Sequence, residues 1–102
     1  MQRLDPQELR SRYRIAAGPL HLPIVEIVAF VSDDEDRIAI VIRERVDNEI
    51  CIVMLHIEES GTYVGCGAYI VGHSQSEAET IAKRELQCVS ASSQISTFNP
   101  RV

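Results

Sequence analysis

The sequence predicts an α+β fold, in which an antiparallel sheet of three to four strands carries two helices packed on one face. Three observations predict it. The chain opens with a helix-start signal, its middle holds runs of β-branched residues between short turns, and an apolar stripe at helical spacing follows. With 102 residues, of which 45% are hydrophobic and 25% charged, the chain suits one domain with one core.

The first helix is predicted to begin at Asp5-Pro6. Asp5 can accept a hydrogen bond from the first helical turn, Pro6 suits the first helical position, and Glu8 stands where a capping box places its acid. The helix must end by Gly18-Pro19, because proline cannot continue a helix.

Four strands are predicted in the middle of the chain, because β-branched residues dominate each run and turn residues separate the runs. The runs are residues 24–31, 37–46, 50–57 and 62–71. Turns this short favour an antiparallel meander.

Two of these strands are apolar on both faces, so a sheet with both helices on one face would leave apolar side chains on the other. We expect that open face to contact a protein partner or a second copy of the chain. Glu26 groups Ile24, Val28 and Phe30 in the outward-facing set, and these three are the predicted interface residues.

The last helix is predicted over residues 76–89, with Ser74 and Glu77 as a second capping box. Its apolar stripe recurs at helical spacing and consists of Ala78, Ile81, Ala82, Leu86 and Val89. The polar end that follows predicts a domain over residues 1–90 and a flexible tail over residues 91–102.

The net charge of −5 argues against a dedicated nucleic-acid binder, although arginines outnumber acids near the N-terminus. No apolar run is long enough to span a membrane, and no signal peptide is apparent. We therefore expect an intracellular protein, cytoplasmic or nuclear, whose three cysteines are reduced.

No catalytic or metal-binding pattern stands out. The histidines and cysteines have no CxxC or HxxxH spacing, so we expect no metal and no cofactor. Gly72-His73-Ser74 is typical of a strand-to-helix turn with a serine cap and lacks a nucleophile elbow. The expected protein is not an enzyme.

Three short patterns resemble the double-stranded-RNA-binding domain family. They are Gly18-Pro19-Leu20-His21-Leu22-Pro23, Tyr63-Val64-Gly65-Cys66-Gly67 and the helix that begins at Ser74. The resemblance covers roughly residues 5–89. It implies two helices on one sheet face, with the first helix, a loop histidine and the last helix touching duplex RNA. The RNA-binding residues implied are Arg10, Arg14, His21, Lys83 and Arg84.

The chain also departs from that family. Gln75, Ser76 and Glu79 stand where the family places lysines on phosphates, and residues 33–60 hold an extra strand or hairpin. Residues 13–17 would be the family's first strand, whereas the local pattern reads as a helix end, and both remain open.

The resemblance therefore implies a non-catalytic binding module for protein interaction or dimerisation, with weak or no binding of double-stranded RNA. The alternative is a small acidic homodimeric regulator or inhibitor unrelated to RNA. A generic α+β domain that matches these short patterns by coincidence stays open, and a small enzyme ranks third among the functions.

Overall fold

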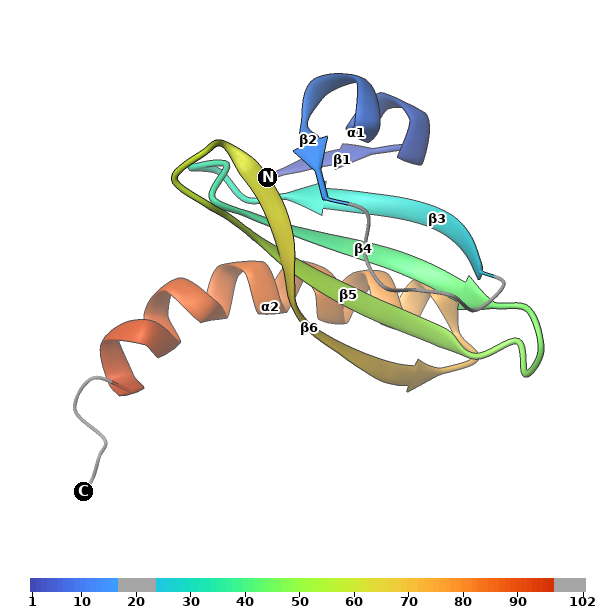
Figure 1. The fold of residues 1–102 in the computed structure, drawn as a ribbon. Coiled ribbons are helices and arrows are strands. Elements are labelled where there is room, and N and C mark those ends of the chain that lie inside the picture. Colours follow the sequence, from blue (N-terminus) through green and yellow to red (C-terminus); the bar gives the residue numbers. More distant parts are fainter. Residues whose placement is uncertain (17–23, 97–102) are drawn as a thin grey trace.

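A computed structural model describes residues 1–16 and 24–96. They form a six-stranded sheet with the strand order β1-β3-β4-β5-β6-β2 (Figure 1). Neighbouring strands are antiparallel except β2, which pairs parallel with β6. In chain order the elements are β1 (Gln2–Leu4), α1 (Pro6–Arg12), β2 (Arg14–Ile15), β3 (Ile24–Val31), β4 (Arg37–Glu44), β5 (Ile50–Ile57), β6 (Thr62–Gly72) and α2 (Gln75–Ser96).

Local sequence signals are confirmed where they were strong. The carboxylate of Asp5 caps α1 by accepting a hydrogen bond from the backbone N–H of Glu8 at 2.8 Å. The hydroxyl of Ser74 accepts one from the N–H of Glu77 at 3.2 Å, at the start of α2. All four central strands are present. Residues 14 and 15, left open between helix and strand, form β2.

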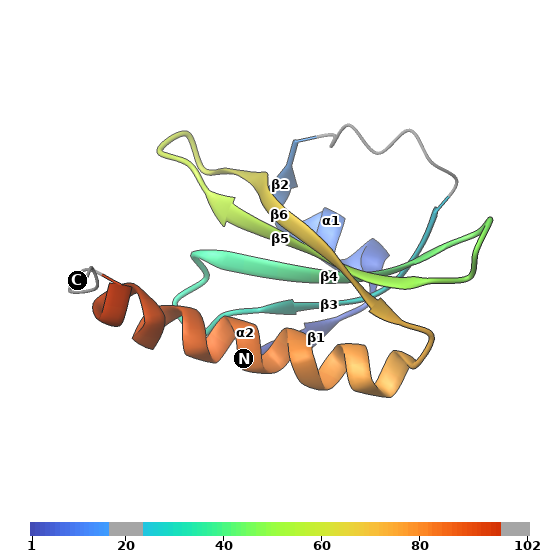
Figure 2. The same ribbon diagram turned by 90° about the horizontal axis from the view of Figure 1, so that it is seen from below.

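The predicted fold class is wrong in its sheet and in the placement of its helices. The sheet is mixed and six-stranded rather than antiparallel with three to four strands, and the helices lie on opposite faces rather than on one (Figures 1 and 2). Arg3 of β1 hydrogen-bonds Glu79 of α2 at 3.3 Å on one face, whereas Leu9 of α1 is buried on the other. The physical reason is that strands apolar at both parities need cover on both faces.

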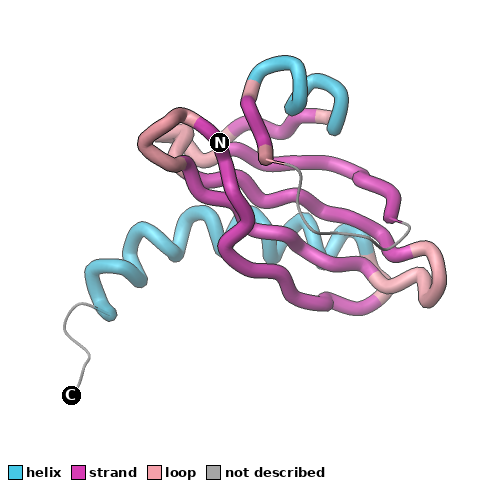
Figure 3. The backbone as a smooth tube through the Cα atoms, in the orientation of Figure 1, coloured by secondary structure: helices cyan, strands magenta, loops and turns pink. Residues whose placement is uncertain are grey.

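The sheet curls because its two edge strands are close together in the chain. In a flat sheet of six strands the edges would lie roughly 24 Å apart. Yet β1 and β2 are joined by α1, whose seven residues span only about 10 Å. The sheet therefore bends towards α1 into a half-barrel whose concave side is the α1 face (Figure 3).

Each face has its own apolar cluster. On the α2 face, Ala78 and Ala82 are fully buried and let the helix approach the sheet closely. The buried members of that cluster are Val28, Phe30, Ala39, Val41, Ile50, Ile52, Met54, Ala78, Ala82 and Leu86. On the α1 face they are Leu4, Leu9, Ala29, Val31, Ile38, Ile40, Ile42, Leu55 and Tyr63.

A β-bulge in β3 changes which side chains share a face. The register with β4 shifts between Glu26 and Val28, so that Ile27 is an extra residue. Before the bulge, Ile24 packs on the α1 face; after it, Val28 and Phe30 are 2% and 1% exposed beneath α2. The expected outward-facing set of Ile24, Val28 and Phe30 is therefore not formed, because the bulge reverses the parity on which it depended.

Two tyrosines close one end of the concave face. The rings of Tyr13 and Tyr63 meet edge to face with centroids 5.4 Å apart. The Tyr13 hydroxyl donates to Oε1 of Glu35 at 3.1 Å, and the Tyr63 hydroxyl donates to the backbone oxygen of the same residue. Burial is the main cause that raises the pKa of both phenols above its ordinary value.

Stability should therefore fall as the pH rises above about 10. A raised pKa in the folded state means that the contribution of Tyr13 and Tyr63 is complete below the pKa of the unfolded chain. It is lost as the pH rises through the folded pKa, because only the unfolded state has already released its protons. Urea midpoints from about pH 8 to about pH 11 should decline less steeply in a Tyr13→Phe/Tyr63→Phe variant. An equally steep decline in that variant would contradict the assignment.

Candidate functional site: the mouth of the half-barrel

A cavity of about 260 Å³ opens on the concave face, and we call it the mouth cavity. The central strands form its floor, while α1 and the end of β2 form a side wall. Its lining residues are Arg10, Ile15, Ala16, Glu26, Ile40, Ile42, Val53, Leu55, Gly65, Gly67 and Ala68.

The side chains on the floor of the cavity become smaller towards β6 along the cross-strand rows. One row runs from Ile40 through Val53 to Ala68, and its side chains become smaller at each step. The neighbouring row places Leu55 of β5 opposite Gly65 of β6. Paired residues share a face, so both rows bring their smallest member to the cavity.

Gly65 is not required by the backbone or by packing. Its φ lies outside the left-handed range, and an ideal Cβ there would meet no atom of the described residues within 4 Å. Glycine inside a strand costs roughly 0.5–1 kcal/mol relative to alanine. Because residue 65 is a glycine, the space above Leu55 stays open.

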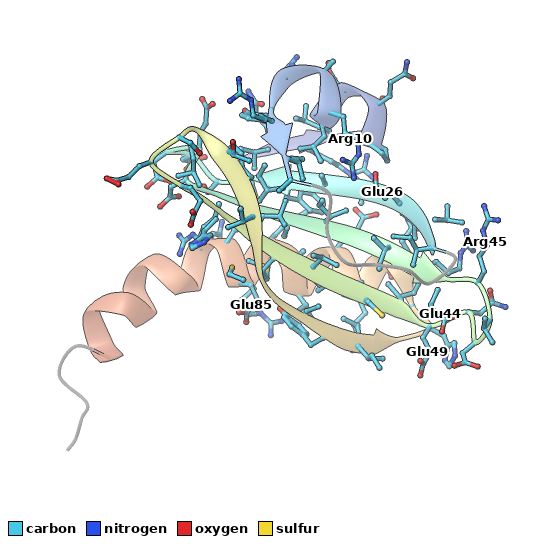
Figure 4. The ribbon with its side chains drawn as sticks, viewed as in Figure 1. Arg10, Glu26, Glu44, Arg45, Glu49 and Glu85 are labelled. Carbon is cyan, nitrogen blue, oxygen red and sulfur yellow. The ribbon has the colours of Figure 1, made fainter. Side chains whose placement is uncertain are left out.

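The cavity's rim carries one ion pair. Arg10 of α1 donates from Nε to Oε1 of Glu26 in β3 at 3.3 Å, and a second bond joins Nη2 to Oε2 (Figure 4). The Glu26 side chain is only 21% exposed, against 48% for Arg10. The hydrogen bond to Glu26 raises the pKa of Arg10, so the guanidinium stays charged. The opposite charges cancel, and the rim is polar but neutral.

The second candidate surface is the outer edge of β6. The edge strand β2 pairs with β6 only at Thr62 and Tyr63. From Val64 to Gly72, no strand of the described residues pairs with β6 on the side away from β5. We call this stretch the open β6 edge. Tyr69 and Ile70 on it are 37% and 62% exposed.

The residues predicted to bind RNA are divided between the two faces. Arg10 and Arg14 come from α1 and β2, and Arg10 is engaged by Glu26. Lys83 and Arg84 come from α2, where Lys83 Nζ lies 5.5 Å from the centroid of the Phe30 ring. His21 lies outside the described residues. The structure does not bring the four described cations onto one surface, and duplex RNA binding stays a prediction.

A cluster of acids at the turn between β4 and β5 was not singled out from the sequence. Carboxylate oxygens of Glu44, Asp47 and Glu49 lie within 4.8 Å of one another (Figure 4 labels the two glutamates). Oε1 of Glu44 already accepts hydrogen bonds from the backbone N–H groups of Val46 and Asp47. Turn geometry accounts for the cluster, and it carries no metal assignment.

Comparison with known proteins identifies no relative: no family profile, curated protein or solved structure matches the chain. The resemblance to the double-stranded-RNA-binding domain family therefore stays a prediction. Within the described residues, no helix combines the length and apolar character needed to cross a membrane.

Proposed function

We propose that the protein is a non-catalytic binding module that self-associates through the open β6 edge. The observation that carries this proposal is a long edge strand without charge. Both functions expected from the sequence, an interaction module resembling an RNA-binding domain and a small acidic regulator, include self-association. The open edge supports this shared part.

An unpaired strand edge exposes backbone N–H and C=O groups that can pair with another strand, and proteins usually protect such edges with charges, proline or short length. The opposite edge of this sheet follows that rule, since β1 has three residues and includes Arg3. The strand β6 has 11 residues, and from Thr62 to Gly72 it contains no charged residue and no proline. Register shifts opposite β5 are the only protective feature that it has among the described residues.

A second copy of the chain is the occupant that fits this edge. Two β6 strands that pair antiparallel about a two-fold axis form a self-complementary contact. The chain has a net charge of −5, but β6 contributes none of it, so no like charges meet along the paired strands. Tyr69 and Ile70 point to opposite faces of the strand and would add apolar contacts on both sides of the joined sheet.

Replacing Ile70 with lysine should convert a dimer into a monomer, or weaken dimerisation by at least about tenfold. The side chain is 62% exposed, so the folded monomer tolerates the change, whereas the dimer would have to bury an unpaired charge. Light scattering and sedimentation measure the mass. Val46→Lys is the matched control, because Val46 is 73% exposed in the turn between β4 and β5 and should leave the mass unchanged.

A parent protein that stays monomeric at about 100 μM would overturn the proposal. So would an Ile70→Lys variant that dimerises as well as the parent, or a Val46→Lys variant that loses the dimer to the same extent. Thermal melts of all three proteins show whether each variant is folded.

A further inference from the structure

We infer that the mouth cavity binds a small, neutral and mostly apolar molecule of roughly ten non-hydrogen atoms. The cavity shares Gly65, Gly67 and Ala68 with the open β6 edge, but its ligand would contact the concave face, whereas self-association would use the backbone groups along the edge of β6. The inference therefore does not depend on self-association.

The size of the ligand follows from the volume of the cavity. A dry apolar cavity of about 150 Å³ holds one benzene molecule in another protein. At about 260 Å³, the mouth cavity has room for a molecule larger than benzene, such as a short aliphatic chain or a substituted ring. Ligand sites are commonly found in the mouths of β-barrels, where a curved sheet supplies a concave apolar wall.

The charge of the ligand follows from the lining. Ile40, Ile42 and Leu55 are 4–5% exposed and give the floor no polar side chain. Among the described lining residues the charged groups are Arg10 and Glu26, which neutralise each other. A charged ligand would lose its hydration without gaining an unpaired counter-charge, whereas a neutral one would bury apolar surface.

The small residues of β6 are the feature that separates this cavity from a packing defect. A valine at position 65 would meet no described atom at its Cβ, would suit a strand, and would cover the apolar floor beside Leu55. The chain instead keeps glycine there and alanine at position 68 in the next row. Stability is commonly below its optimum where a site must stay open.

The experiment titrates the full chain with 1-octanol, a neutral molecule of the right size, and follows backbone amide shifts by NMR. Saturable shifts are expected at Val53, Gly65 and Ala68. Gly65→Val should weaken binding by at least about tenfold, because its side chain fills the cavity. Cys66→Val is the control, since Cys66 follows Gly65 on β6 but is exposed and is not among the described residues that line the cavity.

Ala68→Leu places a side chain in the same space from the row of Ile40 and Val53. It replaces Gly65→Val in the test if that variant does not fold. The absence of saturable binding to the parent would overturn the inference, as would a Gly65→Val or Ala68→Leu variant that binds 1-octanol like the parent. Octanoate that binds as tightly as 1-octanol would overturn the assignment of a neutral ligand. The Ile70→Lys variant should bind 1-octanol unchanged, and its failure to do so would show that the ligand needs the dimer rather than the cavity.

Discussion

Replacing Leu9 with alanine should lower the free energy of unfolding by about 2–5 kcal/mol. Leu9 is fully buried and is the only buried residue of α1. Alanine is the best helix former, so the change removes packing without weakening the helix itself. The loss of stability has two parts: the free energy of burying the leucine side chain is given up, and a cavity is left beneath α1.

The effect should reach beyond α1, because this helix joins the two edges of the curled sheet. Its N-terminal side follows β1 and its C-terminal side leads into β2. Loosening α1 therefore weakens the contact that holds the concave face in shape. Amide exchange at the strand pairs of β1 with β3 and of β2 with β6 should accelerate more than exchange in β4 and β5.

Urea unfolding of the Leu9→Ala variant measures the loss, and Gln7→Ala is the control. Gln7 is exposed in the same helix, so its replacement should change stability by no more than about 0.5 kcal/mol. Equal effects of the two substitutions would show that α1 is not anchored to the concave face.

The sequence predicts the elements of this fold better than their arrangement. The boundaries of β3 and β5 match the predicted runs, because long β-branched segments between turn residues are strong local signals. The two helix starts are equally local, since a cap and the N–H that it binds lie three residues apart.

Local signals of this kind do not predict the edge strands or the face of the sheet that each helix covers. With three and two residues, β1 and β2 are too short for any periodicity, and their pairing depends on partners that are distant in the sequence. Apolar residues at both parities showed that both faces needed cover. They did not show that α1 would take one face and α2 the other.

The candidate site was visible only in part. The uncharged stretch from Thr62 to Gly72 and the strand glycine Gly65 can both be read from the sequence. The mouth cavity cannot, because it arises where residues of α1, β2, β3 and three further strands meet. The rim pair of Arg10 and Glu26 joins residues 16 positions apart that no motif connects.

Replacing Val28 with lysine should unfold the protein, whereas Ile24→Lys should leave it folded. Simple alternation places both residues on one face of β3, and a sheet with an open face would expose them together. The bulge between Glu26 and Val28 separates them. Val28 is 2% exposed within the cluster beneath α2, and a lysine there would place an ammonium group among apolar side chains.

We expect the Val28→Lys variant to lose at least about 4 kcal/mol, which is most of the stability of a small domain. Ile24 is half-buried near the start of β3, and its cross-strand partner is Glu44, so a lysine there gains an opposite charge. Circular dichroism melts of the two variants measure the contrast. If both variants melt close to the parent, Val28 is not buried and the bulge does not reverse the strand. If both unfold, Ile24 belongs to the core, and burial beneath α2 does not by itself explain the loss of stability in the Val28→Lys variant.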